Sequence, residues 1–231
     1  MKGVVLAGGK GTRLAPLTKF TNKHLLPVHD RPMVFFPLET LKKSGIREIL
    51  IVTDGKFLAD FKRILKHFRG VKIAFAIQRR ADGIAGALKL ARKFAAGDSV
   101  AVILGDNLFE DHFRVDVENF KTGAKVFLKK VSDPERFGIA EVRGPRVITI
   151  TEKPRKPKSD LAVVGLYFFD KNVFDIIQKI TPSKRGELEI TDVNNFYIQQ
   201  KTLNSRKIKG FWSDAGTFES LAAATELIRG K

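Results

Sequence analysis

The stretch that decides the fold is Val4-Val5-Leu6-Ala7-Gly8-Gly9-Lys10-Gly11-Thr12-Arg13-Leu14. Its apolar first part contains no polar position, which is typical of a strand buried on both faces of a parallel sheet. The three glycines that follow permit a sharp turn and let backbone N–H groups come close to a ligand. Lys10 and Arg13 add fixed positive charge, which suits a polyphosphate. A tight turn with incidental charges is the plain alternative.

The glycine loop departs from two familiar phosphate-binding patterns. A P-loop has Lys and then Ser or Thr after its last glycine, whereas Gly11 is followed by Thr12 and Arg13. The dinucleotide fingerprint G-x-G-x-x-G needs a glycine where Leu14 stands. The loop therefore resembles a phosphate site without belonging to either class.

Length and composition favour one globular domain over 1–231. The 231 residues are 43% hydrophobic and 29% charged, which is ordinary for a folded domain of this size. No apolar run approaches the roughly 18 residues of a transmembrane helix, and the first residues enter a strand rather than a signal peptide. The absence of cysteine excludes disulfides and thiolate metal sites. We therefore expect a cytoplasmic protein with no membrane partner.

The chain carries a net charge of +17 and has a pI near 10.1. Nucleic acid, an anionic membrane or small anionic substrates would each account for this charge. Basic residues are spread along the chain, with the densest cluster at 153–158, so a solvated surface explains them at least as well as a nucleic-acid footprint. A protein that binds nucleic acid without turnover is the rival from another functional class, although we favour no nucleic-acid partner.

Four apolar runs alternate with helical patterns in the first half of the chain. The runs are Gly3–Ala7, Glu48–Thr53, Val71–Ile77 and Ser99–Leu104. Apolar residues at helical spacing fill the intervals 33–45, 58–68 and 84–95. Alternating strands and helices predict a parallel sheet that is covered by helices on both faces.

Three of the strand ends carry polar or glycine-rich segments. The glycine loop follows the first run, Gln78 and Gly83 follow the third, and Asp106 follows the fourth. In open α/β sheets, ligands bind beyond the carboxyl ends of the parallel strands. The sequence therefore predicts a ligand site where these segments meet.

The pattern changes after about residue 122. Strands are predicted at 124–130, 138–142, 147–151, 161–169 and 202–209, and helices at 173–180, 187–200 and from 218 onward. Short turns join several of these strands, which favours antiparallel pairing and a small extra lobe. We therefore expect an α/β fold: a Rossmann-like, doubly wound mixed sheet in three α/β/α layers with a small inserted β lobe.

Two aspartates are candidates for a metal site. Asp106 is flanked by Gly105 and Asn107 at a strand end, and Asp214 lies in a loop before the last helix. Two carboxylates can hold Mg²⁺ and leave positions for water and phosphate oxygens. An Asx turn or helix N-cap explains Asp214 equally well, and sequence alone does not bring the two residues together.

Two further segments have the chemistry to bind an anion. Glu152 and Lys153 follow a strand, with a surface ion pair as the plain alternative. Arg185 precedes the acidic residues of a predicted helix start, where the helix dipole favours carboxylates. The four histidines show no metal-ligand spacing, and no nucleophile–base pair is recognisable, so covalent catalysis has little support.

Taken in order, these motifs resemble the sugar-1-phosphate nucleotidyltransferases, and most closely the glucose-1-phosphate thymidylyltransferases. The likeness runs from about residue 2 to residue 230. The segments that carry it are Leu6–Leu14, Lys23–Val28, Leu104–Asn107, Asp133–Gly138, Glu152–Pro154, Val163–Asp170, Arg185–Asp192 and Trp212–Thr217. Each segment is weak alone, but the set in this order is highly specific.

The resemblance implies that the phosphate of glucose 1-phosphate attacks the α-phosphorus of dTTP in the presence of Mg²⁺, giving dTDP-glucose and pyrophosphate. Such a transfer needs alignment and charge neutralisation more than acid–base chemistry. By similarity, residues 1–122 form a nucleotide-binding half and residues 123–231 form a sugar-binding half.

The resemblance also implies roles for individual residues. The catalytic residues would be Arg13, Lys23, Asp106, Lys153 and Asp214, with Asp106 and Asp214 as the Mg²⁺ ligands. The nucleotide would be bound by Leu6, Gly8, Gly9, Gly11, Thr12, Arg13, Gln78 and Gly83, of which Gln78 and Gly83 read the base. The sugar phosphate would be bound by Asn107, Gly138, Glu152, Lys153, Val163 and Arg185.

Four positions depart from the family pattern. Ala81 stands where proline is usual, Val164 replaces a usual threonine, and Ser213 and Ala215 flank Asp214 in place of Leu and Thr. The sequence also stops short of extra C-terminal helices that are common in the bacterial enzymes. UTP or another nucleoside triphosphate is therefore the alternative to dTTP, the hexose is left open, and a homodimer is favoured over a tetramer. A glycosyltransferase is less favoured, because no D-x-D motif follows the fourth strand.

Overall fold

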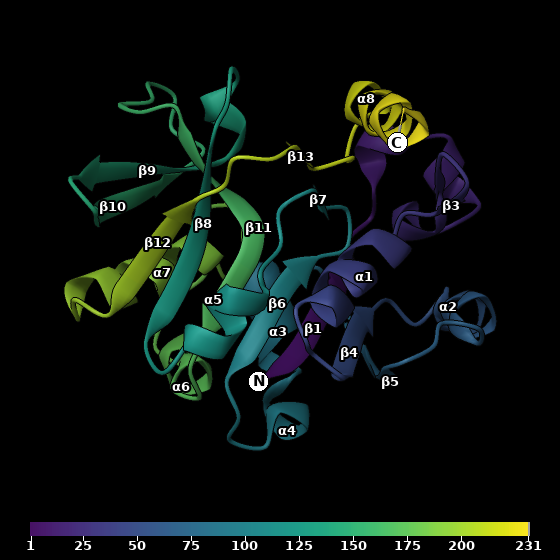
Figure 1. Ribbon diagram of the computed structural model, residues 1–231, viewed down its shortest axis with the longest axis horizontal. Coiled ribbons are helices and arrows are strands. Elements are labelled where there is room, and N and C mark those ends of the chain that lie inside the picture. Colours follow the sequence, from purple (N-terminus) through teal and green to yellow (C-terminus); the bar gives the residue numbers. More distant parts are fainter. Residues whose placement is uncertain (231) are drawn as a thin grey trace.

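A mixed sheet of nine strands forms the centre of the protein, and the computed structural model describes residues 1–230 (Figure 1). Seven strands lie in the order β10 (Arg146–Glu152), β9 (Gly138–Arg143), β11 (Leu161–Phe169), β6 (Val100–Leu104), β1 (Lys2–Ala7), β4 (Glu48–Thr53) and β5 (Lys72–Ile77). β8 (Ala124–Lys130) pairs with β11, and β12 (Leu203–Lys207) pairs with β8. The predicted α/β class with a mixed sheet is confirmed.

Four neighbouring strands, β6, β1, β4 and β5, are parallel and end at one edge of the sheet. Leu6 lies opposite Leu104, and Ala7 lies opposite Thr53, which in turn lies opposite Ile77. These residues are at or next to the carboxyl ends of their strands, so the segments that follow leave the sheet together. The edge predicted to bind a ligand is formed in this way.

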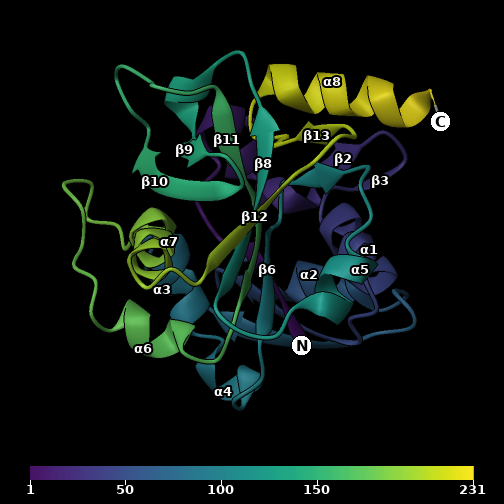
Figure 2. The same cartoon turned by 60° about the vertical axis from the view of Figure 1, so that its left-hand side comes forward.

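Helices cover both faces of the sheet (Figures 1 and 2). Val5 and Ala7 of β1 belong to a buried cluster that includes residues of α1 (Phe35–Lys43), α2 (Leu58–Leu65) and α5 (Arg114–Asn119). Val4 and Leu6 belong to a second cluster with α3 (Ile84–Lys89), α4 (Arg92–Ala95), α6 (Val173–Ile177) and α7 (Ile190–Gln199). Alternate residues of one strand therefore serve two cores, as the strand period requires.

Three differences from the predicted elements concern α3, α7 and β12. The helix expected over 84–95 is divided into α3 and α4, because the N–H groups of Leu90 and Ala91 donate three residues back in a tight turn. The helix expected from residue 187 starts only with α7, because the Leu188 N–H donates to a carbonyl in the loop before α3. Finally, β12 runs parallel to β8, whereas the short turns of this half favoured antiparallel pairing.

The small lobe is the antiparallel hairpin β9–β10, which forms one end of the sheet and projects from the rest of it (Figure 1). It is paired with β11 through a single residue pair, Ala162 and Ile139. The hairpin also packs against α7. Residues of β9 and β10 are thereby brought beside the carboxyl end of β6, although they are distant from it in the sequence.

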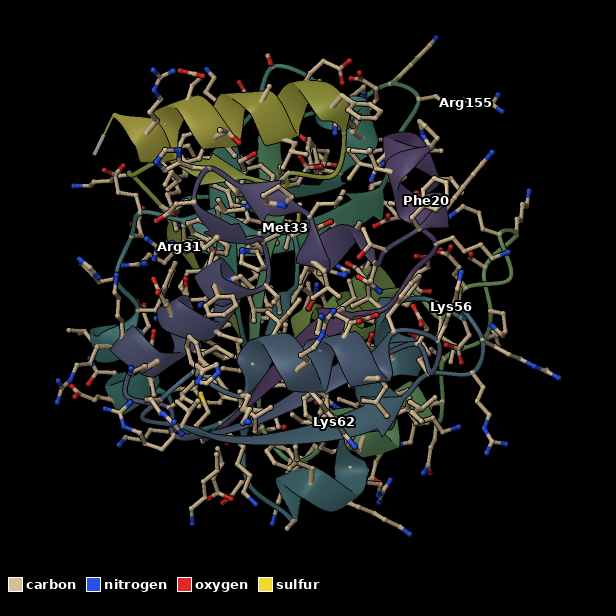
Figure 3. All side chains as sticks on the ribbon, turned by 90° about the vertical axis from the view of Figure 1, so that its right-hand side faces the viewer. Phe20, Arg31, Met33, Lys56, Lys62 and Arg155 are labelled. Carbon is tan, nitrogen blue, oxygen red and sulfur yellow. The ribbon has the colours of Figure 1, made fainter. Side chains whose placement is uncertain are left out.

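The C-terminal helix covers the segment that follows the glycine loop. α8 (Phe218–Arg229) lies over the short hairpin of β2 (Pro27–Val28) and β3 (Arg31–Pro32), with Met33 and Ala224 buried in the same cluster (Figure 3). β7 (Leu108–Phe109) pairs with β13 (Trp212–Ser213), which was expected to be a loop. This pairing ties the end of β6 to the loop that carries Asp214.

Positive side chains are spread over the surface. In Figure 3, nitrogen-tipped side chains project around the whole outline of the view, and Lys56, Lys62 and Arg155 are among those labelled. No helix formed by residues 1–230 is both long and apolar enough to cross a membrane.

Candidate active site

A cleft of about 630 Å³ opens at the carboxyl ends of the parallel strands. Its volume is in the range of small-molecule sites. The predicted site residues that line it are Leu6, Gly8, Gly9, Arg13, Lys23, Gln78, Gly83, Asp106, Asn107, Gly138, Glu152, Lys153, Val163 and Asp214. Gly11, Thr12 and Arg185 do not line it.

The glycine loop delivers Arg13 to this cleft. Gly9 and Gly11 have φ angles of 95° and 61°, in the left-handed region that glycine adopts most easily. The chain then enters a 3₁₀ turn, Thr12–Leu14, whose last residue is fully buried. Gly11 and Thr12 therefore shape the turn, and Arg13 is the residue of this turn that reaches the cleft.

Lys23 is positioned by a buried asparagine. Asn22 accepts from the His24 N–H at the start of the 3₁₀ turn Lys23–Leu25, and its Nδ2 donates to the Ala7 carbonyl at the end of β1. Lys23 is thereby held beside β6, where its Nζ lies 2.5 Å from Asp106 Oδ2. The two side chains are only 15% and 11% exposed, so this ion pair is largely shielded from water.

A second ion pair holds Asp214. Arg136, which comes from the 3₁₀ turn before β9, donates to Asp214 Oδ2 at 3.1 Å and to Asp133 Oδ2 at 2.5 Å. Burial, followed by the negative charge of Asp106, raises the pKa of Asp214 above its usual value. Burial is also the largest single influence on Asp106 and opposes its ionisation, but the charge of Lys23, together with the hydrogen bonds from Lys23 and Asn107 and the charge of His24, outweighs it, so the pKa of Asp106 is lowered. The two carboxylates are therefore close enough to influence each other's charge.

Asp106, Asp214 and Arg13 meet around Gly216. A Cβ atom built on Gly216 would lie 3.3 Å from Arg13 Nη2, 3.5 Å from Asp106 Oδ2 and 3.1 Å from the carbonyl oxygen of Asp214. Among residues 1–230, no group of three or more His, Cys, Asp or Glu side chains is placed to hold a metal ion. The donor set fits a hard divalent cation that takes two carboxylates from the protein and its other oxygens from water and phosphate.

Gln78 and Gly83 line the cleft from the loop between β5 and α3. Gln78 Nε2 donates to Asp82 Oδ1 at 2.8 Å, while a Cβ atom on Gly8 would lie 2.5 Å from Gln78 Oε1. Gly83 has a φ angle of 94°, and a Cβ atom there would lie 2.5 Å from the carbonyl oxygen of Leu188. The Gln78 amide is thus held between two glycine-bearing loops.

Glu152 and Lys153 enter the cleft from the end of β10. The Thr191 hydroxyl donates to Glu152 Oε2 at 2.6 Å, which ties α7 to β10. Lys153 has a φ angle of 44° and a side chain that is 48% exposed. Glu152 and Lys153 therefore line the cleft from the second half of the chain, whereas the loops that carry Arg13 and Gln78 come from the first half.

Asn107 is bonded mainly to protein groups. Its Oδ1 accepts from the Gly165 N–H at 3.0 Å and from Trp212 Nε1–H at 2.7 Å, and its Nδ2 donates to Asp106 Oδ1 at 2.9 Å. The residue is 1% exposed. Asn107 therefore orients Asp106 through one of the two hydrogens of its amide.

Arg185 lies outside the cleft lining and is engaged by carboxylates. Its Nη2 lies 2.9 Å from Glu189 Oε1, 3.3 Å from Glu152 Oε1 and 3.5 Å from Glu187 Oε2. Burial is the largest single influence on Arg185 and disfavours its charge, but the hydrogen bond to Glu189 and the negative charges of the three glutamates together outweigh it, so the pKa of the guanidinium is raised. A phosphate would have to draw Arg185 away from three glutamates, so its role in sugar-phosphate binding stays a prediction.

The structure adds residues that the sequence reading did not single out. The further side chains in the lining include Arg136, Phe137, Tyr167, Thr191, Asn194 and Trp212. Most of them lie within the motifs that carry the family resemblance, and their place in those motifs was the available signal. Asn194 lies beyond the last residue of its motif. The one sequence signal for Asn194 is its spacing: a polar residue lies four positions after the apolar Ile190, and therefore on the same face of the predicted helix.

His24 makes the stability of this region sensitive to acid. It is 1% exposed, and burial, followed by the charge of Lys23, lowers its pKa to about 3. The unfolded chain takes up this proton near pH 6.5, whereas the folded chain does not. The contribution of neutral His24 to the free energy of unfolding is therefore fully present above pH 6.5, and it is lost progressively as the pH drops toward 3. We expect a loss of about 1.4 kcal/mol per pH unit in this window, measured by denaturant unfolding.

Two variants separate His24 from the other titrating groups. His24→Gln should flatten the acid dependence by about this amount, whereas His67→Gln, at an exposed position after α2, should keep the wild-type slope. If His24→Gln and the wild type lose stability equally between pH 6 and pH 4.5, the prediction is wrong.

Known proteins of similar sequence point to one family. Residues 2–230 match the family described as nucleotidyl transferase. A glucose-1-phosphate thymidylyltransferase of Neisseria meningitidis is 42% identical over 238 residues, which cover 99% of this chain and 83% of that protein. A protein of the same name from Xanthomonas campestris is 44% identical over 98% of this chain and 80% of its own length.

Solved structures agree with this result. A Bacillus anthracis protein described as a glucose-1-phosphate thymidylyltransferase, crystallised with sucrose, has a TM-score of 0.95 and 47% identity over 100% of this chain and 96% of that chain. A UDP-glucose pyrophosphorylase complexed with UDP-glucose shares the fold, with a TM-score of 0.87 and 24% identity over 99% and 98% of the two chains. The resemblance read from the sequence is confirmed, and the chain belongs to the nucleotidyl transferase family.

Proposed function

We propose that the protein transfers a thymidylyl group from dTTP to glucose 1-phosphate in the presence of Mg²⁺, giving dTDP-glucose and pyrophosphate. The observation that carries this proposal is the meeting of Arg13, Lys23, Asp106 and Asp214 in one cleft. Loops of the first half and strands of the second half line the same cleft. Family membership and the names of the relatives support the same reaction.

The reaction asks the protein for alignment and charge rather than proton transfer. A phosphate oxygen of glucose 1-phosphate forms a bond to the α-phosphorus of dTTP. The bond from that phosphorus to the oxygen bridging to the β-phosphate breaks, and its electron pair leaves with pyrophosphate. Negative charge spreads over the phosphate oxygens on the way, so fixed cations and backbone N–H groups stabilise the transition state.

The first half of the chain is proposed to bind the nucleotide. Arg13 and Lys23 would hold the triphosphate and stabilise the leaving pyrophosphate, because both are cations that reach the cleft. The residues proposed to contact the nucleotide through the backbone or by close approach are Leu6, Gly8, Gly9, Gly11 and Thr12. Gln78 and Gly83 would read the base.

The second half is proposed to bind the sugar phosphate. Lys153 would hold the phosphate, with Arg185 as a second cation if it leaves its glutamates. Glu152 accepts from Thr191 through one carboxylate oxygen and would take hexose hydroxyls with the other. The backbone at Gly138 and Val163 and the remaining amide hydrogen of Asn107 complete the proposed contacts.

Asp106 and Asp214 are proposed to hold Mg²⁺. When bound, the ion supplies positive charge to the phosphate oxygens and helps to orient them. In the free protein, Lys23 and Arg136 each neutralise one of the carboxylates, which keeps two like charges compatible at short range. Asn107 fixes the orientation of Asp106 from the side.

UTP is the second candidate nucleotide. Ala81 lines the cleft next to the loop that carries Gly83, so the departure from the usual proline falls where base selectivity would be set. A change in backbone rigidity at this position would alter how closely the loop approaches the base.

The test is a matrix of pyrophosphate-release assays that combines dTTP, UTP and other nucleoside triphosphates with several hexose 1-phosphates and Mg²⁺. We expect the highest kcat/KM for dTTP with glucose 1-phosphate. A higher value with UTP would favour the second candidate. Absence of pyrophosphate release with every pair, together with tight and steeply salt-dependent binding of nucleic acid, would favour the rival class.

Replacing Gly8 by alanine is expected to weaken nucleotide binding without unfolding the protein. The new Cβ atom would lie 2.5 Å from Gln78 Oε1, so the flexible Gln78 side chain must move out of place. Loss of one base contact corresponds to a rise of about tenfold in the KM for dTTP. Gln78→Ala should give a similar rise, and the double variant should be no worse than either single change, because both act on one contact. An unchanged KM in Gly8→Ala would contradict this.

We further propose that residues 1–122 and 123–231 form the nucleotide and sugar halves of one domain, since Gln78 and Glu152 enter the cleft from these two parts. A cytoplasmic location would provide the nucleoside triphosphate. A homodimer is proposed in preference to a tetramer, and Val115 on α5, which is 67% exposed, offers apolar surface to a second copy. Light scattering on the purified protein tests the oligomeric state.

A further inference from the structure

The side chain of Asn194 is the least explained feature of the cleft. It is 1% exposed on α7, and neither its Oδ1 nor its Nδ2 has a hydrogen-bond partner among residues 1–230. Buried amides in folded proteins are almost always hydrogen-bonded. An amide that loses its hydrogen bonds to water on burial and gains none in the protein costs free energy. An asparagine in this state implies a partner from outside the chain.

The helix places this unpaired amide at the cleft. Asn194 follows Ile190 by four residues and Thr191 by three, so the three share one face of α7. All three residues line the cleft, and the Thr191 hydroxyl donates to Glu152. The amide therefore belongs to the wall that carries the residues proposed to bind the hexose.

The next residue shows how the same helix uses an asparagine for structure. Asn195 Oδ1 accepts from the Ile150 N–H at 2.9 Å, and its Nδ2 donates to the Ile150 carbonyl at 2.8 Å. This double hydrogen bond fastens α7 to β10, so the attachment of the helix does not depend on Asn194. A leucine of similar size would meet the packing needs of position 194 without any unpaired polar atom.

A hydroxyl group is the partner that suits a free amide. Nδ2 needs an acceptor and Oδ1 needs a donor, and a hydroxyl oxygen or a water can serve as both. A phosphate oxygen would satisfy only the donor of the amide. The Thr191 hydroxyl on this wall already donates to Glu152. The hexose is the ligand proposed to lie against Glu152, so its hydroxyl groups, or a water held beside them, are the partners within reach of this wall.

We propose that Asn194 is a specificity-determining residue for the sugar, and that its amide hydrogen-bonds one hydroxyl of the hexose, directly or through a single held water. The inference rests on the proposed function, because that function places a hexose 1-phosphate in this cleft. A sugar that lacks the contacted hydroxyl leaves the amide unpaired and is used less well.

The test measures kcat/KM for glucose 1-phosphate and for each of its monodeoxy analogues. With the wild type, one analogue should be used about tenfold to a hundredfold less well than glucose 1-phosphate. In Asn194→Leu, kcat/KM for glucose 1-phosphate should fall by a similar factor relative to the wild type. The kcat/KM of this variant for that analogue should equal the wild-type value for the analogue, and its KM for dTTP should be unchanged. Its thermal midpoint should equal or exceed that of the wild type, which a structural role would not produce. If the leucine variant does not fold, the same kcat/KM values are measured with Asn194→Ala.

Asn195→Ala is the matched control. It loses two hydrogen bonds to Ile150 and should unfold at a lower temperature, yet it should keep the wild-type ratio of kcat/KM between glucose 1-phosphate and the analogues. The inference is overturned if the wild type uses every monodeoxy analogue as well as glucose 1-phosphate, or if Asn194→Leu keeps the wild-type selectivity.

Failure of the proposed function gives a different result. A wild type that turns over no hexose 1-phosphate overturns the proposed reaction. Calorimetric binding of glucose 1-phosphate to the wild type and to Asn194→Leu then decides the inference, and equal affinities overturn it. A crystal structure with the bound sugar separates a direct bond from a water-mediated one, and an Asn194 amide without a partner in that structure would also overturn the inference.

Discussion

Replacing Asp106 by asparagine is expected to lower kcat by roughly a thousandfold or more while the protein stays folded. Asp106 is 8% exposed at the end of β6 and lies beside Lys23, Asn107 and the loop of Asp214. Asparagine keeps an oxygen for the Asn107 bond but removes the negative charge that a divalent cation requires. The loss should therefore appear in turnover and in Mg²⁺ affinity, measured by initial rates over a Mg²⁺ titration and by Mn²⁺ binding.

The matched control for this variant is Asp98→Asn. Asp98 lies just before the opposite end of the same strand, where its side chain is 55% exposed and sits 3.7 Å from Lys2. The chemical change is identical, but the position is remote from the cleft, so kcat should stay within a factor of two or so of the wild type. A near-normal kcat in Asp106→Asn would refute the metal role of Asp106.

The first half of the fold was predictable because its signals are local. The run Glu48–Thr53 forms β4 with the predicted bounds. Each strand and helix of this half is recognisable from residues that are neighbours in sequence. The same holds for β8 and β11, whose predicted bounds agree with the structure. Buried parallel strands must be apolar throughout, which makes them easy to recognise.

The parts that were missed depend on contacts between distant segments. β7 and β13 are two residues each, so neither has a periodic pattern, and they pair across about a hundred residues of chain. The direction of β12 was also inaccessible, because the apolar pattern of a strand does not fix whether its neighbour runs parallel or antiparallel. The division between α3 and α4 reflects a local tight turn that the helical spacing concealed.

The same distinction applies to the site. Gln78 and Asp106 were found because they follow apolar strands, and the topology of a parallel sheet brings such positions together. The partners of the carboxylates could not be found in this way. Arg136 belongs to a motif of the family resemblance, but its bond to Asp214 depends on where the turn before β9 lies in the fold, and no local pattern predicts that position. The unpaired state of Asn194 likewise becomes visible only when all of its neighbours are known.

Replacing Lys23 by methionine should have the second large effect, and it should act on stability as well as turnover. Lys23 Nζ lies 2.5 Å from Asp106 Oδ2, with 15% and 11% of the two side chains exposed. Removing the lysine leaves a buried carboxylate without its cation, a change that costs about 3–5 kcal/mol in well-shielded pairs. Turnover should also fall by a factor of about 10² to 10⁴, because a cation proposed to stabilise the leaving pyrophosphate is lost.

A double-mutant cycle distinguishes this effect from a general loss of packing. In Lys23→Met/Asp106→Asn no buried charge is left unpaired, so the double variant should be more stable than Lys23→Met alone. Added Mg²⁺ should raise the thermal midpoint of Lys23→Met more than that of the wild type, because Asp106 is then free to take the ion. Lys130→Met is the control: Lys130 and its partner Asp160 have side chains that are 78% and 46% exposed, and loss of this pair should cost about 1 kcal/mol or less with turnover unchanged. If the double variant is destabilised by the sum of the two single changes, Lys23 does not act through Asp106, and the paired-charge account of this site fails.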